Sequence, residues 1–298
     1  MQIIKELKKI PDLSLALGFF DGVHKGHQAV IKNAVDFAKN NGLKSAVVTF
    51  SNHPHCYFYD VPPKYILTSD ERAKHIASLE IDYLIELDFE SISGLTAEDY
   101  LKDVLVRNFM PQAITTGWNH NFGYKKSGNV KFLADNSRKF NYVYFEIPPQ
   151  KDGNVTISST VIRNYLSKGE IQKANSMLGF NFSISGKVVK GKQLGRTIGF
   201  PTVNLIYPTE LIELPFGVYA VRVKIEGQLF KGVTNFGIRP TVSDSKLATL
   251  ETFIVDFNQD VYEKMIEVEF LKMIRSEKKF PSLDALKNQI DKDIKEIV

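Results

Sequence analysis

The chain has few of the residues that mark secreted or membrane proteins. Its 298 residues include a single cysteine, Cys56, which cannot form an internal disulfide, and such thiol usage is typical of a reducing compartment. No apolar run approaches the roughly 18 residues of a membrane span, and the N-terminus lacks the apolar core of a signal peptide. The sequence therefore predicts a cytoplasmic protein.

An excess of charge of either sign is also missing. The 38 basic and 34 acidic residues leave a net charge of +4, which is too small for this length to indicate nucleic acid or a membrane surface as partner. Apolar residues make up 43% and charged residues 24%, as in ordinary globular proteins. We expect one large or two ordinary domains, each able to bury its own core. The expected oligomeric state is a monomer or a weak homo-oligomer.

The hydrophobic period divides the chain near residue 181. Residues 1–181 alternate strand-like and helix-like segments, which favours crossover units and a mostly parallel sheet. In residues 182–298 the period becomes two, as in Gly217–Glu226, which predicts an antiparallel sheet or small barrel followed by a helix that begins near Leu283. The other expected strands are Ser45–Phe50, Tyr83–Leu87, Ala113–Gly117, Tyr142–Ile147, Ser183–Val189, Leu250–Phe257 and Met265–Ile274.

The segment LALGFFDGVHKGHQ, residues 15–28, outlines a phosphate site. A strand that ends at Phe20 leads into a glycine turn, and the helix that follows opens with backbone N–H groups that have no partner inside the helix. His24 and His27 project to one side of the first turn and can donate to the same phosphate oxygens. The segment resembles the nucleotidyltransferase signature, in which one phosphate attacks the α-phosphorus of ATP. Its predicted phosphate contacts are Gly18, Phe19, Asp21 and Gly22.

Two later segments supply groups that such a site needs. ISSTVIR places Ser158, Ser159 and Arg163 at the start of a helix, where they could hold the departing pyrophosphate, although serines there are often only caps. TGWNHNFGYKKSGN, residues 116–129, is a polar loop after a strand, a position that binds ligands in open α/β sheets.

A zinc site at His53, His55 and Cys56 is not favoured. The chain has no second cluster with ligand spacing, and Pro54 holds the two histidines in an extended segment.

The second half carries its own set of candidate residues. Thr202 and Asn204 lie two apart on an expected strand, so their oxygens face one way and suit Mg²⁺ that already carries nucleotide phosphates. Glu251, on an otherwise apolar strand, could accept a hydroxyl proton, or it is a carboxylate at the rim paired with an arginine. The stretch 186–199 could cover phosphates or form an exposed basic hairpin; its candidate contacts are Gly186, Lys187, Gly191, Arg196 and Gly199.

In this order, the motifs resemble the prokaryotic bifunctional riboflavin kinase/FMN adenylyltransferase family, also called FAD synthetase, over nearly the whole chain. The motifs that carry the resemblance are GFFDGVHKGH, TFSNHP, TGWNHNFG, ISSTVIR, GRTIGFPTVNL, GVTNFGIRPT, ETFIVDF and IRSEKKFPSLDALKNQI.

The resemblance implies a Rossmann-like α/β nucleotidyltransferase domain in residues 1–181 and a six-stranded antiparallel riboflavin kinase barrel with a terminal helix in residues 182–298. It implies that Glu251 deprotonates riboflavin for attack on the γ-phosphate of MgATP, with Thr202 and Asn204 at the metal. FMN would then attack ATP beside His24 and His27 to give FAD. ATP is a co-substrate, and FMN and FAD are products rather than bound prosthetic groups. The implied flavin contacts are Asn119, Asn121, Phe122, Asn235 and Arg239.

One loop departs from the family pattern. The family usually has GxDFxFG, whereas residues 117–123 here are GWNHNFG, with Asn119 in place of an aspartate and His120 in place of an aromatic residue. Altered flavin affinity is the expected result. Two alternatives stay open: a riboflavin kinase whose adenylyltransferase half is weak or inactive, and a non-catalytic regulator that binds flavin or RNA.

Overall fold

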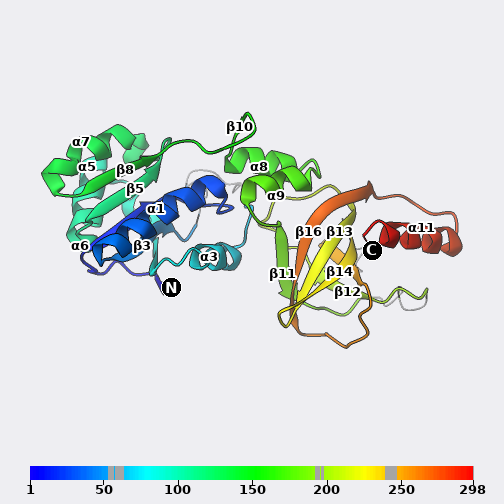
Figure 1. Ribbon diagram of the computed structural model, residues 1–298. Helices are drawn as coiled ribbons and strands as arrows, with labels where there is room; N and C mark the ends of the chain where they lie inside the picture. The colour runs from blue at the N-terminus through cyan, green and yellow to red at the C-terminus, as the bar shows by residue number, and fades with distance from the viewer. Residues whose placement is uncertain (53–56, 58–63, 192–194, 196–197, 239–246, 298) are drawn as a thin grey trace. The chain divides into compact units, whose positions relative to one another are not determined.

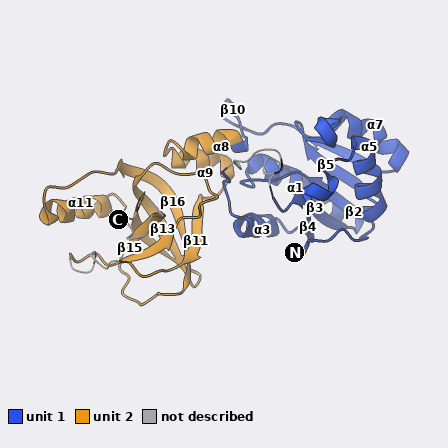
Figure 2. Cartoon of the chain, turned by 180° about the vertical axis from the view of Figure 1, so that it is seen from behind, with its two compact units in different colours: residues 1–159 blue, residues 160–298 orange. Residues whose placement is uncertain are grey.

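The chain folds into two compact units, residues 1–159 and residues 160–298 (Figure 2). The structure is a computed structural model that describes residues 1–52, 57, 64–191, 195, 198–238 and 247–297. Helices α8 (Ser159–Leu166) and α9 (Ile171–Leu178) thus group with the barrel, although the period of the sequence changes only near residue 181. Residue 181 as the limit of the first catalytic domain stays a prediction.

The first unit is built on a six-stranded parallel sheet, which confirms the predicted class (Figure 1). The strands lie in the order β1-β4-β3-β2-β5-β8, and every neighbouring pair is parallel. Their bounds are β1 Gln2–Ile4, β2 Leu13–Leu17, β3 Lys44–Phe50, β4 Tyr83–Leu87, β5 Ala113–Gly117 and β8 Val143–Ile147.

Helices cover both faces of this sheet, so the central strands are buried on two sides. Helix α1 (Lys25–Asn41) packs against β2, β3 and β5. The π-helix η1 (Tyr100–Val106) and helix α7 (Val130–Phe140) pack against the other face in one apolar cluster with Leu13, Leu15 and Leu17. The shorter elements are α3 Ser69–Ala77, α4 Phe89–Ile92, α5 Ala97–Asp99, α6 Arg107–Phe109, η2 Tyr124–Lys126 and the paired strands β6 Asn121–Phe122, β7 Gly128–Asn129, β9 Lys151–Asp152 and β10 Val155–Thr156.

Local signals account for where several elements begin and end. Thr68 and Glu71 form a reciprocal capping box at the start of α3, and Gly42 ends α1 in the left-handed conformation. Strand β2 stops at Leu17, three residues before the predicted end at Phe20. The cause is a turn whose Phe20 and Val23 have φ of 60° and 37°, values that no strand residue can adopt.

The second unit contains a six-stranded antiparallel sheet in the order β11-β16-β13-β14-β15-β12, as predicted. An isolated bridge between Val189 and Asn204 brings the first and last strands together, so the sheet is nearly closed into a barrel. Glu226 and Gly227, both with positive φ, make the tight turn between β13 and β14. The strands are β11 Ser183–Lys187, β12 Thr202–Ile206, β13 Gly217–Ile225, β14 Gln228–Ile238, β15 Ala248–Ile254 and β16 Met265–Ser276.

The terminal helix α11 (Leu283–Lys295) is capped by Ser282 and anchored by one buried ion pair. Asp293, whose side chain is 3% exposed, accepts three hydrogen bonds from the Arg275 guanidinium on β16 at 2.8 to 3.1 Å. Because the pair is shielded from water, loss of either partner would leave an uncompensated buried charge, so the pair ties α11 to the barrel.

Candidate active sites

Buried contacts with Ile66 fix the conformation of the turn between β2 and α1. The Asp21 carboxylate is buried and accepts the Ile66 N–H at 3.0 and 3.3 Å. A Cβ on Gly22, which has φ of 82°, would lie 2.8 Å from Ile66, so only glycine fits. The Asp21 side chain therefore stabilises the turn, and the backbone of residues 18–24 remains as the part that can contact a phosphate.

His24 and His27 lie together at the N-terminus of α1. Their rings stack 3.5 Å apart, tilted by 17°, and Gly26 permits this because a Cβ there would lie 3.1 Å from the His24 ring. His24 is the N-cap residue, and its Nδ1 accepts the His27 N–H at 3.2 Å. A neutral His24 therefore carries its proton on Nε2, which makes Nε2 a donor.

The ISSTVIR segment is connected to the same turn. The Ser159 hydroxyl donates to the Asp21 carbonyl oxygen at 2.9 Å. Ser158 precedes α8 directly, and Arg163 lies on α8 one turn after Ser159. Ser159 is thus fixed to the turn of residues 18–27, which we call the histidine turn, and this contact gives one predicted pyrophosphate ligand a structural role.

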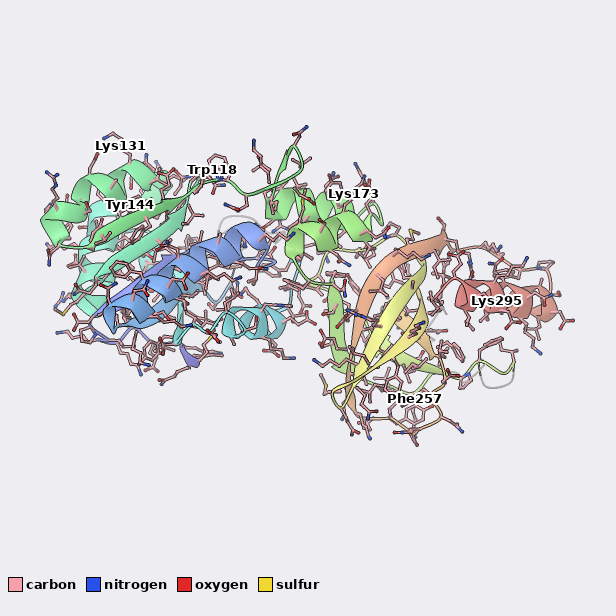
Figure 3. The ribbon with its side chains drawn as sticks, viewed as in Figure 1. Trp118, Lys131, Tyr144, Lys173, Phe257 and Lys295 are labelled. Atoms are coloured by element: carbon pink, nitrogen blue, oxygen red, sulfur yellow. The ribbon has the colours of Figure 1, made fainter. Side chains whose placement is uncertain are left out.

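The loop after β5 exposes several polar and aromatic groups at the carboxyl end of the sheet. Trp118, labelled in Figure 3, is 46% exposed, and its backbone N–H donates to the Ile147 carbonyl at 3.0 Å. Asn119 and Asn121 are also exposed and are joined by a hydrogen bond from the Asn121 amide to the Asn119 carbonyl at 2.9 Å. Phe122 is half-buried and packs against aromatic rings of η1 and α7. Side chains at 118, 119 and 121 are thus available to a ligand.

His120 differs from its neighbours in this loop. Its ring stacks on Phe122 at 5.7 Å, and its Nε2 is buried without a hydrogen-bond partner among the described residues. Burial lowers the pKa of His120 to about 4, so the imidazole is neutral at physiological pH. A neutral ring can occupy this aromatic position, but one buried nitrogen remains unsatisfied.

In the barrel, strand register brings three predicted site residues into one row. Glu251 on β15 lies opposite Asn204 on β12 and opposite Asn235 on β14. We call Asn204, Glu251 and Asn235 the polar row. Their strand neighbours Thr234 and Thr252 face the barrel interior, fully buried and hydrogen-bonded to each other at 2.8 Å. Because side chains alternate along a strand, the polar row is on the outer face.

The glycine-rich segment before β12 lies close against this row. A Cβ on Gly191 would stand 2.6 Å from the Asn204 amide nitrogen, so the close approach requires glycine. Thr202, two residues before Asn204, is on the same face of β12. Three further candidates come from the stretch 186–199. Gly199 has φ of 90°, and a Cβ on Gly186 would lie 3.5 Å from Leu205. Lys187 forms an exposed ion pair with Glu263. Five residues considered above lie outside the described residues: Arg196, Arg239, and the zinc candidates His53, His55 and Cys56.

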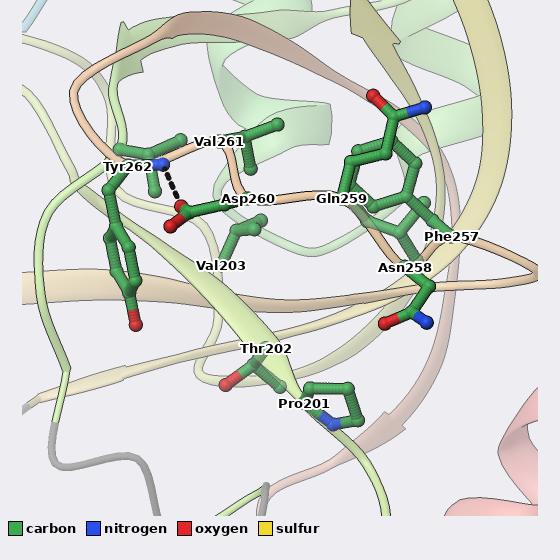
Figure 4. A pocket seen from close by; sticks show the side chains of 11 residues that line it. Pro201, Thr202, Val203, Phe257, Asn258, Gln259, Asp260, Val261 and Tyr262 are labelled. Carbon is green, nitrogen blue, oxygen red and sulfur yellow. Dashed lines mark hydrogen bonds between the residues drawn. The ribbon is translucent and has the colours of Figure 1, made fainter.

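A cavity of about 550 Å³ opens beside Thr202 (Figure 4). Its walls come from the end of β11, the start of β12 and the segment after β15, in which the Asp260 carboxylate accepts the Tyr262 N–H at 3.0 Å. The segment was not singled out from the sequence, although the turn-forming run Asn258–Asp260 between two expected strands is a signal of a ligand-binding loop. The lining residues are Val188, Pro201, Thr202, Val203, Ile254, Phe257, Asn258, Gln259, Asp260, Val261 and Tyr262.

The oxygens of Thr202 and Asn204 fit a divalent cation whose other ligands are nucleotide phosphates and water. Thr202 and Asn204 offer two neutral oxygens on one face, and Gly191 leaves the space beside Asn204 that a Cβ would fill. Mg²⁺ is often bound by few protein groups together with nucleotide phosphates. Within the described ranges, no cluster of three or more His, Cys, Asp or Glu side chains could hold a metal by itself. No helix in those ranges has the length and apolar composition to cross a membrane.

Two family models together match most of the chain. The FAD synthetase model matches residues 7–161, and the riboflavin kinase model matches residues 178–298. The histidine turn is inside the first match, and the polar row is inside the second.

Individual relatives match along nearly the full length. A bifunctional riboflavin kinase/FMN adenylyltransferase from Haemophilus influenzae is 35% identical, with 99% of this chain and 97% of the relative covered. One from Buchnera aphidicola is 37% identical, with coverages of 98% and 95%. A solved structure from Streptococcus pneumoniae, described as a macrolide-efflux protein, superimposes with a TM-score of 0.89 at 31% identity and covers 98% of this chain and 97% of its own. On this evidence the chain belongs to the family of bifunctional riboflavin kinase/FMN adenylyltransferases.

Proposed function

We propose that this protein makes FAD from riboflavin in two ATP-dependent steps. It phosphorylates riboflavin to FMN, and it then adenylylates FMN with release of pyrophosphate. The observation that carries this proposal is that one chain holds two separate clusters of polar side chains: the stacked His24 and His27 in the first unit and the polar row in the second.

The kinase step is assigned to the polar row. Glu251 accepts the proton of the riboflavin 5′-hydroxyl while the riboflavin oxygen bonds to the γ-phosphorus of ATP. The bond between the γ-phosphorus and the oxygen that bridges it to the β-phosphate breaks, and ADP is released. Thr202 and Asn204 would hold Mg²⁺, which supplies positive charge to the phosphates when bound. The cavity beside Thr202 is large enough for the ATP base and sugar.

The adenylyltransferase step is assigned to the histidine turn. A phosphate oxygen of FMN bonds to the α-phosphorus of ATP, and the bond to the β-phosphate breaks, so pyrophosphate leaves. His24 Nε2 and the N-terminus of α1 stabilise the negative charge that builds up on the transferred phosphate. Ser158, Ser159 and Arg163 are assigned to the departing pyrophosphate, together with the backbone of residues 18–22.

The flavin contacts are assigned to the exposed loop of the first unit and to the outer face of the barrel. Asn119, Asn121 and Phe122 would contact FMN, and Asn235 would contact riboflavin. The family resemblance adds Arg239, which lies outside the described residues, to the riboflavin contacts. The lone cysteine supports a cytoplasmic location. The mixture of acidic and basic residues, with a net charge of only +4, supports the absence of a nucleic-acid partner. A monomer or weak homo-oligomer is part of the proposal.

The test is a time course of purified protein with riboflavin, ATP and Mg²⁺, followed by chromatography of the flavins. FAD as final product supports the proposal, FMN alone supports a kinase with an inactive second half, and unchanged riboflavin supports a binding protein. Glu251→Gln should abolish FMN formation and leave FAD synthesis from added FMN intact. Glu226→Gln, in an exposed turn of the same barrel, is the matched control and should change neither step.

A further inference from the structure

A charged side chain is buried directly beneath the histidine turn. Arg72 lies on α3 next to the buried residue Glu71 and one turn before the buried residue Ile76, and only 4% of it is exposed. An arginine is rarely buried to this extent unless it is paired, because transfer of its charge out of water is costly. Its contacts therefore indicate what it does.

The Arg72 guanidinium connects the carboxyl ends of three neighbouring parallel strands. Nη1 donates to the Phe19 carbonyl at 3.4 Å, just after β2, and Nη2 donates to the Phe50 carbonyl at 3.1 Å, at the end of β3. Nη2 also contacts the Glu86 carboxylate on β4 at 3.5 Å, where the Glu86 side chain is 11% exposed. The guanidinium carbon lies 4.7 Å from the centre of the Phe19 ring. One planar group thus fixes both the backbone and the ring of Phe19.

Arg72 keeps its positive charge in spite of its burial. Burial lowers the pKa of Arg72, while the carboxylates of Glu86 and Asp21 oppose that effect. A guanidinium nevertheless stays protonated in proteins. A lysine would carry the same charge on a single nitrogen, which cannot donate in two fixed directions and also lie flat over a ring.

The Phe19 carbonyl begins the strained part of the turn. It receives a second hydrogen bond, from the Thr49 hydroxyl at 3.1 Å. Since a peptide bond is planar, fixing this carbonyl also fixes the N–H of Phe20. Phe20 and Val23 both have positive φ, a conformation that costs free energy for such side chains and persists only where the surroundings hold it. The turn then leads directly to His24 and the N-terminus of α1.

We propose that Arg72 is a positioning residue for adenylyl transfer, which acts by holding the Phe19–Phe20 peptide so that the turn presents His24 and the first N–H groups of α1 to the phosphates. Arg72 acts through Phe19 and does not touch substrate. The inference rests on the proposed adenylyltransferase function of this turn, and it adds a residue from a different helix to that site.

The test compares Arg72→Lys and Arg72→Met with the wild type and with Arg138→Lys, an exposed arginine on α7 of the same unit. FAD formation from FMN and ATP is measured at saturating and limiting substrate. We expect kcat to fall about 10-fold in the lysine variant and about 100-fold in the methionine variant, because small misplacements of reacting groups cost that much. KM for both substrates should stay within about twofold of the wild type, and Arg138→Lys should match the wild type.

Two further measurements separate positioning from a general loss of fold. Riboflavin phosphorylation by each variant reports on the other unit and should be unchanged. In Arg72→Ala, which leaves a space of guanidinium size, low millimolar guanidinium should restore part of kcat.

Several outcomes would overturn the inference. They are an unchanged kcat with a lowered unfolding midpoint, a parallel loss of both activities, a raised KM with normal kcat, or failure of guanidinium to rescue. If the wild type itself makes no FAD from FMN, the proposed function fails instead, and the two failures are distinguishable.

Discussion

Replacement of His120 by phenylalanine should remove a pH dependence of stability from the first unit. In the folded protein His120 is stacked on Phe122 with Nε2 buried and unpartnered within the described residues, and burial lowers its pKa to about 4. In the unfolded chain a histidine has a pKa of about 6.5. Phenylalanine has a ring of similar size and no group that titrates.

The two pKa values define the direction and the size of the effect. The folded value is the lower one, so the unfolded state binds more protons between about pH 6.5 and pH 4, and protonation favours unfolding there. The stability contribution of a neutral His120 is therefore complete above about pH 6.5 and is lost as the pH falls through this window. From these two values the loss at pH 5 is about 2 kcal/mol.

The assay is urea unfolding followed by the fluorescence of Trp118, which is the only tryptophan and lies two residues from His120. The unfolding free energies of wild type and His120→Phe are compared at pH 8 and pH 5. The other five of the six histidines are common to both proteins, so the difference between the two isolates His120. At pH 8 the variant should be more stable by about 1 kcal/mol, because no buried nitrogen is left unpaired.

An equal loss of stability in both proteins between pH 8 and pH 5 would refute this reasoning. It would mean that the His120 imidazole reaches water in the folded state, and that the pH dependence comes from other groups.

Three further predictions test other parts of the structure. Gly191→Ala should lower kcat for riboflavin phosphorylation about 10-fold or more, because its Cβ would stand 2.6 Å from the Asn204 amide, and should spare FAD synthesis from added FMN. Saturating FMN should quench the emission of Trp118, and an unchanged spectrum would exclude flavin from that loop. Asp293→Ala should destabilise the barrel unit by about 3 to 5 kcal/mol, measured by denaturation, because it leaves Arg275, with 18% of its side chain exposed, as a largely buried unpaired charge.

Local features of the fold are accessible from the sequence because they depend on residues close together in the chain. The capping box at Thr68 and the helix end at Gly42 are examples, because each depends on a few neighbouring residues of suitable type. The early end of β2 is not visible in the sequence, because an apolar run of this kind does not reveal that Phe20 adopts a positive φ. That conformation depends on contacts with residues far along the chain, such as Ile66 beside Gly22.

The composition of the sites is more accessible than their arrangement. The residue types of the polar row can be singled out individually, but the pairing of Glu251 with both Asn204 and Asn235 depends on strand register, which a sequence does not specify. The sequence does not single out Arg72 either, because its contacts are with residues far along the chain. On a helical wheel it lies above Ile76, on the buried side of α3, and a charged residue at such a position is the signal that could have identified it.

The two clusters have opposite electrical character, which is consistent with their assignment to different phosphates. The histidine turn presents N–H donors, and the first turn of α1 has no acidic residue, so this site can stabilise a phosphate directly through donors and the helix dipole. The polar row presents a carboxylate beside neutral amide oxygens, which would repel a bare triphosphate at the same distance. Phosphates can approach that row only if a cation lies between them and the oxygens.

The two clusters also differ in their ability to take a proton from an attacking group. The carboxylate of the polar row is suited to take a proton from a hydroxyl. The histidine turn offers no carboxylate for this purpose, since Asp21 is buried and accepts the Ile66 N–H. An attacking phosphate such as that of FMN, already an anion, would need no carboxylate at the turn, whereas an alcohol such as riboflavin would lose its proton to the carboxylate of the row.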